Sequence, residues 1–99
     1  MRTMMKVTIP VEAGNKAIAD GSMPRIIQDA VERIRPEAVY FVSENGKRTA
    51  LFFFDLADSS QLPVISEPLF QLGADVQLTP AMNAQDLQKG LSSLGGGHR

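Results

Sequence analysis

The chain has 99 residues, 43% of them apolar, and contains no cysteine. This length holds one small domain, and the cysteine count excludes disulfides, thiolate metal sites and cysteine nucleophiles. Ten basic residues balance eleven acidic ones to a net charge of −1, so the basic excess typical of nucleic-acid binding is missing. Because the chain has no apolar run of membrane-spanning length and no signal-peptide pattern at its start, we expect a soluble, cytoplasmic protein without a membrane partner.

The first predicted element is a strand that ends at Pro10. Apolar residues alternate with polar ones before this proline, at Met5, Val7 and Ile9, as is typical of a half-buried strand. The period then changes, and residues 12–20 predict a short helix or turn.

A longer helix is predicted over residues 23–34. Its apolar residues follow helical spacing, at Ile26, Ile27, Ala30, Val31 and Ile34. Ser22 is the predicted N-cap, and Pro24 falls in the first turn, where its missing N–H costs nothing. Pro36 ends the helix.

A β-hairpin is the clearest local signal in the chain. Residues 37–43 and 47–56 are rich in β-formers, and the Asn45-Gly46 pair between them favours a type I′ turn. A two-residue turn places Val42 opposite Thr49 and divides the hairpin side chains into two mostly apolar faces. The first face consists of Ala38, Tyr40, Val42, Thr49, Leu51, Phe53 and Asp55. We expect the helices to cover the second face, which consists of Val39, Phe41, Ser43, Arg48, Ala50, Phe52 and Phe54.

A further helix is predicted from four apolar residues at helical spacing, Leu62, Ile65, Leu69 and Leu72. Pro68 is expected to kink this helix, and Gly73 to end it. Alternation over residues 74–79 then predicts a fourth strand, which ends at Pro80.

The C-terminal part of the chain predicts a short helix and a tail. Asn83 and Asp86 have the spacing of a capping arrangement, which predicts a helix that continues to about Leu91. Residues 92–99 predict a flexible tail. The chain is therefore expected to form a single domain over residues 1–91.

The order of the predicted elements is β-α-β-β-α-β with a short C-terminal helix, which is the ferredoxin-like motif of the α+β class. Right-handed crossovers make it an antiparallel four-stranded sheet with two helices on one face. The opposite face then exposes Ala38, Val42, Leu51 and Phe53, a patch of the kind that marks an interface. We expect two copies to pack their sheets together as a homodimer, with Val42, Leu51 and Phe53 in the interface. The alternative is a different register, in which these residues belong to the rim or the core.

Short segments between Met5 and Leu91 carry a resemblance to a known group of proteins. The segments are Asn15-Lys16-Ala17-Ile18, Asp20-Gly21, Arg35-Pro36-Glu37-Ala38-Val39-Tyr40-Phe41, Gly46-Lys47-Arg48-Thr49, Glu67-Pro68-Leu69-Phe70, Pro80-Ala81-Met82-Asn83 and Asp86-Leu87. They resemble the dimeric α+β barrel superfamily, whose ferredoxin-like subunits pair through their sheets, and are most similar to a small, uncharacterised bacterial family within it. The resemblance implies this fold but no activity, because the superfamily includes monooxygenases, lactone isomerases, haem-dependent enzymes and ligand-sensing domains.

Three polar residues are candidates for the wall of a barrel cavity between two paired sheets. Lys6 and Asp75 lie on neighbouring strands, and both are expected on the open face. They either transfer a proton or bind an anion as a couple, or they form an interface salt bridge or stay exposed at strand edges. Tyr40 either closes a ligand pocket or serves as an interface residue whose hydroxyl finds a neighbour.

Arg48 is the fourth candidate ligand-binding residue. It stands beside the hairpin turn, where it either pairs with Glu67 and ties the hairpin to a helix, or receives an anionic ligand at a cavity mouth. Asn15 and Lys16 are further donors for a small anion, without the glycine-rich loop of a phosphate site. No catalytic residue, metal site or cofactor is predicted, and the single histidine, His98, lies in the predicted tail.

We therefore expect a homodimer that binds a small organic molecule in its barrel cavity. The alternative is a small cofactor-independent enzyme of the isomerase or monooxygenase type, which uses Lys6, Asp75 or Tyr40 as acid–base groups. The chain has no tryptophan, which counts against the monooxygenase type. A third class is an accessory subunit that binds a partner protein. RNA recognition is not expected, since the first strand has no stacking aromatic residue and the net charge is −1.

Overall fold

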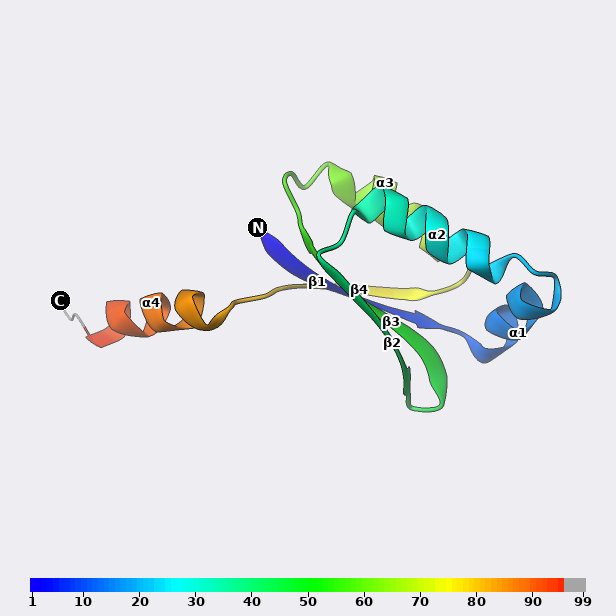
Figure 1. Cartoon of the computed structure of the whole chain (residues 1–99), viewed down its shortest axis with the longest axis horizontal. Coiled ribbons are helices and arrows are strands. Elements are labelled where there is room, and N and C mark those ends of the chain that lie inside the picture. The colour runs from blue at the N-terminus through cyan, green and yellow to red at the C-terminus, as the bar shows by residue number, and fades with distance from the viewer. Residues whose placement is uncertain (96–99) are drawn as a thin grey trace.

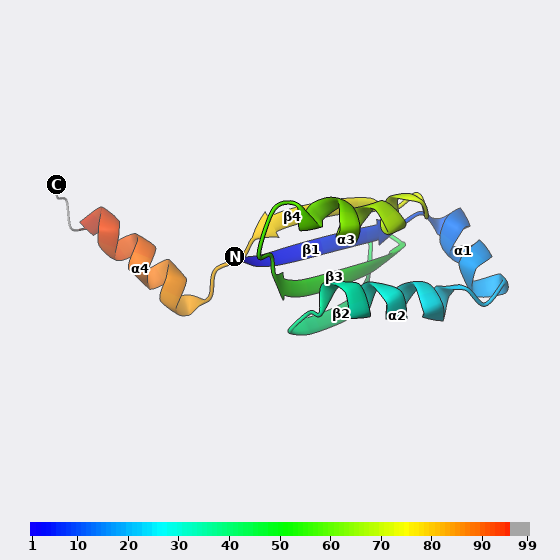
Figure 2. The same ribbon diagram turned by 90° about the horizontal axis from the view of Figure 1, so that it is seen from above.

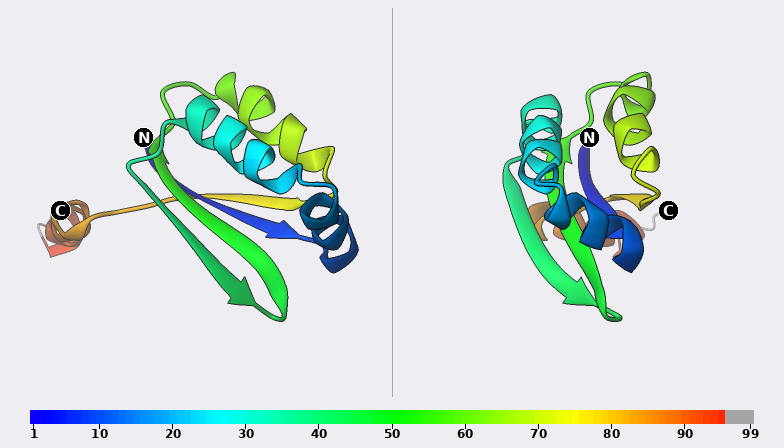
Figure 3. Two further views of the ribbon diagram at one scale, coloured as in Figure 1. Left: turned by 45° about the vertical axis from the view of Figure 1, so that its right-hand side comes forward. Right: turned by 90° about the vertical axis from the view of Figure 1, so that its right-hand side faces the viewer.

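The computed structural model describes residues 1–95, which form a four-stranded sheet and four helices. The elements in chain order are β1 (Arg2–Ile9), α1 (Val11–Ala19), α2 (Met23–Ile34), β2 (Ala38–Glu44), β3 (Lys47–Asp55), α3 (Gln61–Phe70), β4 (Asp75–Pro80) and α4 (Ala84–Gly95). α2 and α3 lie side by side on one face of the sheet, and α1 stands at the end of that layer (Figure 1). The described helices leave the opposite face of the sheet open (Figure 3).

The strands are ordered β2-β3-β1-β4, and each neighbouring pair is antiparallel. β1 is thus an inner strand, held between β3 and β4. One connection, through α1 and α2, joins β1 to β2, and the other, through α3, joins β3 to β4 (Figure 2). This α+β arrangement is consistent with the predicted ferredoxin-like motif.

The β2–β3 hairpin has the predicted turn and register. Asn45 and Gly46 both have positive φ, 54° and 74°, as a type I′ turn requires. Val42 pairs with Thr49 across the two strands. Because the turn fixes the register, it also decides which side chains share a face of the sheet.

The core lies between the helix layer and one face of the sheet. Phe52 and Phe54 are 2% and 1% exposed, so the prediction that their face of the hairpin packs on the helices is confirmed. Alternating residues of β1 complete this face of the sheet. The buried apolar residues are Met5, Val7, Ile9, Ala17, Met23, Ala30, Ile34, Ala50, Phe52, Phe54, Ile65, Leu69 and Ala74.

α2 begins at Met23 with Ser22 at the N-cap position, as predicted, but the Ser22 side chain forms no capping hydrogen bond. The backbone N–H of Ser22 instead donates to Oδ1 of Asp20 at 2.8 Å, so the aspartate organises this helix start. β1 begins at Arg2 rather than near Met5, because β3 is long enough to pair with these additional residues.

α4 is set apart from the rest of the molecule. None of its residues is buried, and it extends the molecule along its longest axis (Figure 1). The predicted capping arrangement at its start is confirmed. The N–H of Asp86 donates to Oδ1 of Asn83 at 2.8 Å, and the N–H of Asn83 donates to Oδ2 of Asp86 at 3.0 Å.

α4 is also longer than predicted. It continues past Leu91 to Gly95, so residues 92–95 of the predicted tail are helical. His98 lies outside the described residues. No described helix combines the length and the apolar character that a membrane crossing needs.

Candidate functional site

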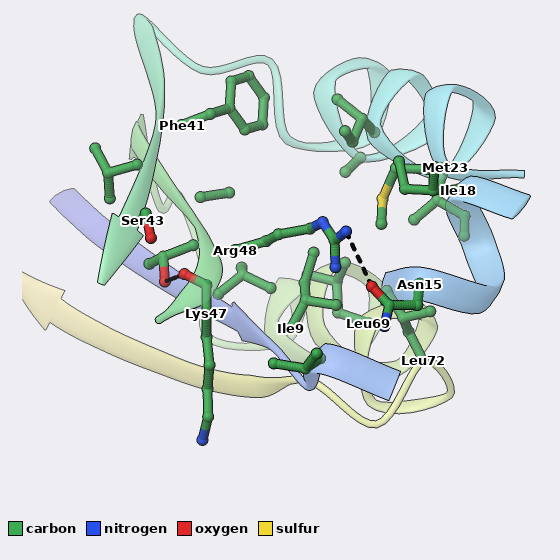
Figure 4. A pocket seen from close by; sticks show the side chains of 18 of the residues that line it. Ile9, Asn15, Ile18, Met23, Phe41, Ser43, Lys47, Arg48, Leu69 and Leu72 are labelled. Carbon is green, nitrogen blue, oxygen red and sulfur yellow. Dashed lines mark hydrogen bonds between the residues drawn. The ribbon is translucent and has the colours of Figure 1, made fainter. Parts of the chain in front are cut away.

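A cavity of about 600 Å³ lies on the helix-covered side of the sheet, between the β2–β3 hairpin and the helices (Figure 4). This volume falls in the range of about 300–1,000 Å³ that is typical of small-molecule sites. The apolar part of its wall comes from the sheet and from α1, α2, α3 and the turn after it, and includes Val7, Ile9, Ile18, Met23, Ile26, Ile27, Phe41, Ala50, Phe52, Leu69 and Leu72.

The cavity forms because the hairpin extends beyond the helix layer. β2 and β3 curve away from α2 toward their turn (Figure 3). Phe41 belongs to the helix-facing side of the hairpin, yet it is 57% exposed, and Ile18 on α1 is 55% exposed. Both side chains border the cavity (Figure 4). The structure therefore leaves large apolar side chains around a hollow, where water contacts them at a cost in free energy.

Arg48 supplies a polar corner of this cavity. Its side chain extends from β3 toward α1, where Nη2 donates to Oδ1 of Asn15 at 3.1 Å (Figure 4). A guanidinium group has five N–H donors, and the bond to Asn15 uses one of them. The ion pairs formed within residues 1–95 do not include Arg48.

The predicted ion pair between Arg48 and Glu67 is therefore wrong. Glu67 lies on α3, which packs near β4 (Figure 2), whereas the Arg48 side chain bonds to Asn15 on α1. The sequence indicated Asn15 and Arg48 as separate donors for an anion, and the structure brings them together. Lys16, which was predicted together with Asn15, does not line this cavity.

Gly14 makes room for the Arg48 guanidinium. It is buried in α1, and a methyl group on its Cα would lie 2.5 Å from Nη1 of Arg48. Sequence reasoning missed this residue. The available signal was a glycine inside a helical segment, where glycine costs about 1 kcal/mol relative to alanine and so calls for a packing or functional reason.

The charged side chains in the cavity wall are basic. Arg48 points inward, and Lys47 extends outward from the hairpin (Figure 4). Within the described part of the chain, no aspartate or glutamate contributes to the wall. The local charge of the cavity is therefore positive, although the whole chain has a net charge of −1.

Lys6 and Asp75 lie on the open face of the sheet, away from this cavity. The strand register puts both on that face, as predicted. The partner of Lys6 is nevertheless Glu44 on β2, with which Nζ forms an ion pair, and not Asp75. The pair crosses β3 at the level of Thr49, which is only 2% exposed. The Lys6–Glu44 pair is therefore part of the sheet surface and covers a buried threonine.

Tyr40 also lies on the open face, where it is 60% exposed. Its ring meets the ring of Phe53 edge to face, with the centroids 6.4 Å apart. By register, Val42 and Leu51 share this face, and Val42 is 42% exposed. We call this group the open-face patch; its members are Ala38, Tyr40, Val42, Leu51 and Phe53. The four predicted ligand-binding residues are thus divided, with Arg48 on one side of the sheet and Lys6, Tyr40 and Asp75 on the other.

Three exposed carboxyl groups have a lowered pKa, and each lies at the start of a helix. Hydrogen bonds from Ser22 lower the pKa of Asp20, and hydrogen bonds from Ser60 lower the pKa of Asp58. A hydrogen bond from the backbone N–H of Asn83 lowers the pKa of Asp86. These interactions organise the starts of α2, α3 and α4, and none of the three aspartates lines the cavity.

The described residues contain no cluster of three or more histidine, cysteine, aspartate or glutamate side chains that would hold a metal ion. No family model matches the chain, and no curated protein sequence matches it. Membership of the dimeric α+β barrel superfamily therefore stays a prediction. The fold established by the structure is a small α+β domain with a four-stranded antiparallel sheet.

Proposed function

We propose that this protein binds a small, largely apolar organic molecule in the cavity between the hairpin and the helices. The observation that carries this proposal is a hollow of about 600 Å³ whose wall is mostly apolar and includes Arg48 among a few polar residues. Ligand sites commonly combine an apolar wall with a few convergent polar groups. This location differs from the predicted one, which was a barrel cavity on the other side of the sheet.

The exposed apolar side chains at the border of the cavity support the proposal that it holds a ligand. Phe41 and Ile18 are each more than half exposed at the border of the cavity. A bound apolar molecule would remove this surface from water and gain about 25 cal/mol for each Å² of apolar area buried. The cavity also lies beside the core around Phe52, so part of its wall consists of buried, close-packed side chains.

A titration with 1-octanol tests this proposal. We expect backbone amide signals from the cavity wall, such as those of Ile9, Met23 and Ala50, to shift in nuclear magnetic resonance spectra. The variant Ile18→Trp, which places a large ring at the cavity border, should weaken binding at least about tenfold, because it occupies the space of the ligand.

The matched control is Val64→Trp. Val64 is 59% exposed on α3 and does not line the cavity, so this change should leave octanol binding unaltered. Signals that stay unshifted at millimolar octanol would contradict the proposal. So would equal binding by the two tryptophan variants and the unmodified protein.

We also propose that the open-face patch pairs two copies of the chain through their sheets. The support for this is an exposed apolar group on a sheet face that the described helices leave uncovered, with Tyr40 and Val42 at its surface. Face-to-face packing of two such sheets about a twofold axis would bury both patches. The interface would contain Val42, Leu51 and Phe53, and the result would be a dimeric α+β barrel.

The acid–base groups of the alternative enzyme, Lys6, Tyr40 and Asp75, do not converge on the cavity. Lys6 is paired with Glu44, and the other two side chains are exposed on the open face. Ligand binding is therefore the function that the geometry supports best.

A further inference from the structure

We propose that the ligand of the cavity is an organic acid, and that its carboxylate binds Arg48 at a seat formed by Gly14 and Asn15. This inference rests on the proposed function, because it assigns a ligand class to the same cavity. It goes further in naming the group that recognises the ligand and the backbone position that holds that group in place.

Arg48 brings a positive charge to the wall of the cavity. Arg48 is exposed in the structure, so a molecule that fills the cavity would remove part of the water from its guanidinium group, and a charge that loses water without gaining a partner is destabilised. Asn15 satisfies one N–H group, and within residues 1–95 no carboxylate forms an ion pair with Arg48. A neutral apolar ligand would leave that cost in place. An acid would supply the missing charge, and the planar guanidinium matches a carboxylate through two parallel hydrogen bonds.

The composition of the cavity wall also favours an acid. Lys47 and Arg48 are its charged residues, and the rest of the wall is largely apolar. A ligand that complements this wall has a hydrocarbon body and a single anionic group. Sugars and nucleotides need many polar partners and do not match this pattern.

Gly14 is a positioning residue for the Arg48 guanidinium group. Alanine would be the better helix former in α1, so helix formation does not explain a glycine there. The close approach of Nη1 of Arg48 explains it, because a methyl group would lie 2.5 Å from that atom. Arg48 is flexible at this end, so alanine at position 14 would displace the guanidinium group and leave the fold intact.

The experiment compares octanoate with 1-octanol, which have the same chain length and differ in the charged group. We expect the unmodified protein to bind octanoate at least about tenfold more tightly, as a charge-assisted pair of hydrogen bonds would provide. Arg48→Met should remove this preference and retain octanol binding. Gly14→Ala should reduce the preference in the same direction, whereas the control Gly90→Ala, at a helical glycine with no neighbour within 4 Å, should not.

The outcomes separate the two proposals. Equal affinity of the unmodified protein for octanoate and octanol would overturn the acid inference and leave cavity binding in place. Binding of neither probe would overturn both proposals. A full octanoate preference in Gly14→Ala, with unchanged thermal stability, would overturn the role of Gly14, and a full preference in Arg48→Met would overturn that of Arg48.

Discussion

Arg35 shows how a single residue can be held in an unfavourable backbone conformation by the element that it ends. It follows the last turn of α2 with φ 53° and ψ 60°, in the left-handed region, and its N–H donates to the carbonyl of Val31 at 2.8 Å. Residues with a β-carbon pay about 1–2 kcal/mol to adopt this conformation. Glycine adopts this conformation without that cost, although it loses more conformational entropy when the chain folds.

We therefore expect Arg35→Gly to raise the free energy of unfolding by about 0.5 kcal/mol, the difference between these two effects. Arg33→Gly is the matched change inside α2, where the loss of helix propensity should lower the free energy of unfolding by about 1 kcal/mol. Urea unfolding followed by circular dichroism measures both values. A decrease of equal size in the two variants would show that the left-handed geometry at Arg35 costs nothing.

The residues of the candidate site were only partly predictable from the sequence. The sequence indicated Arg48 and Asn15 as hydrogen-bond donors for an anion. The assignment of Glu67 as the partner of Arg48 was wrong. Whether the Arg48 side chain reaches α1 or α3 depends on how far the hairpin extends past the helix layer, and no local sequence pattern encodes that distance. Gly14 acts through one close approach to Arg48, so its role becomes visible only in three dimensions.

The elements were predictable where the signal is local. Asn45-Gly46 specifies the hairpin turn, and the turn specifies the register of β2 and β3. The end of α4 was predicted too early, because serine and glycine are weak helix formers. In the structure the hydroxyls of Ser92 and Ser93 donate to the carbonyls of Gln88 and Lys89, one turn earlier in the helix. Because their hydroxyls form these bonds within the helix, the two serine side chains do not bond to backbone groups in a way that would require a non-helical conformation.

α4 contributes little to the stability of the sheet and its helix layer. It has no buried residue, and its ion pair with the sheet, between Arg2 and Asp86, lies on the surface. We expect a chain that ends at Asn83 to unfold with a free energy within about 1 kcal/mol of the full chain, the typical upper value for a surface ion pair.

The contrast for this truncation is a substitution in the core. Leu69→Ala, at a residue that is 6% exposed, should cost about 2–5 kcal/mol. Chemical denaturation of both proteins gives the comparison. A loss in the truncated chain as large as that in Leu69→Ala would mean that α4 packs on the domain in solution.

The whole molecule is more extended than its length requires. Its radius of gyration is 16.5 Å and it measures 59 × 29 × 19 Å, whereas a compact domain of about 100 residues has a radius near 13 Å. α4 accounts for the long axis (Figure 1). The domain also carries two apolar regions on opposite sides of one sheet, the cavity wall and the open-face patch, and Val42 borders both.

Light scattering coupled to size-exclusion chromatography tests the pairing at this scale. We expect a dimer at micromolar concentration, and we expect Phe53→Glu to give a monomer, because a charge would be buried without a partner in the interface. Gln88→Glu, on the exposed surface of α4, should leave the dimer intact. A monomeric unmodified protein, or a dimer that persists in Phe53→Glu, would contradict sheet-to-sheet pairing.

Consecutive residues of β3 serve the two proposed activities in turn, ligand binding on one side of the sheet and self-association on the other. Its side chains alternate, so that Arg48, Ala50 and Phe52 belong to the cavity side and Leu51 and Phe53 to the open face. Neighbouring codons of one short stretch of the gene would therefore report on different traits, ligand capture and self-association. A substitution at Phe52 would then act first on ligand capture and one at Phe53 first on self-association.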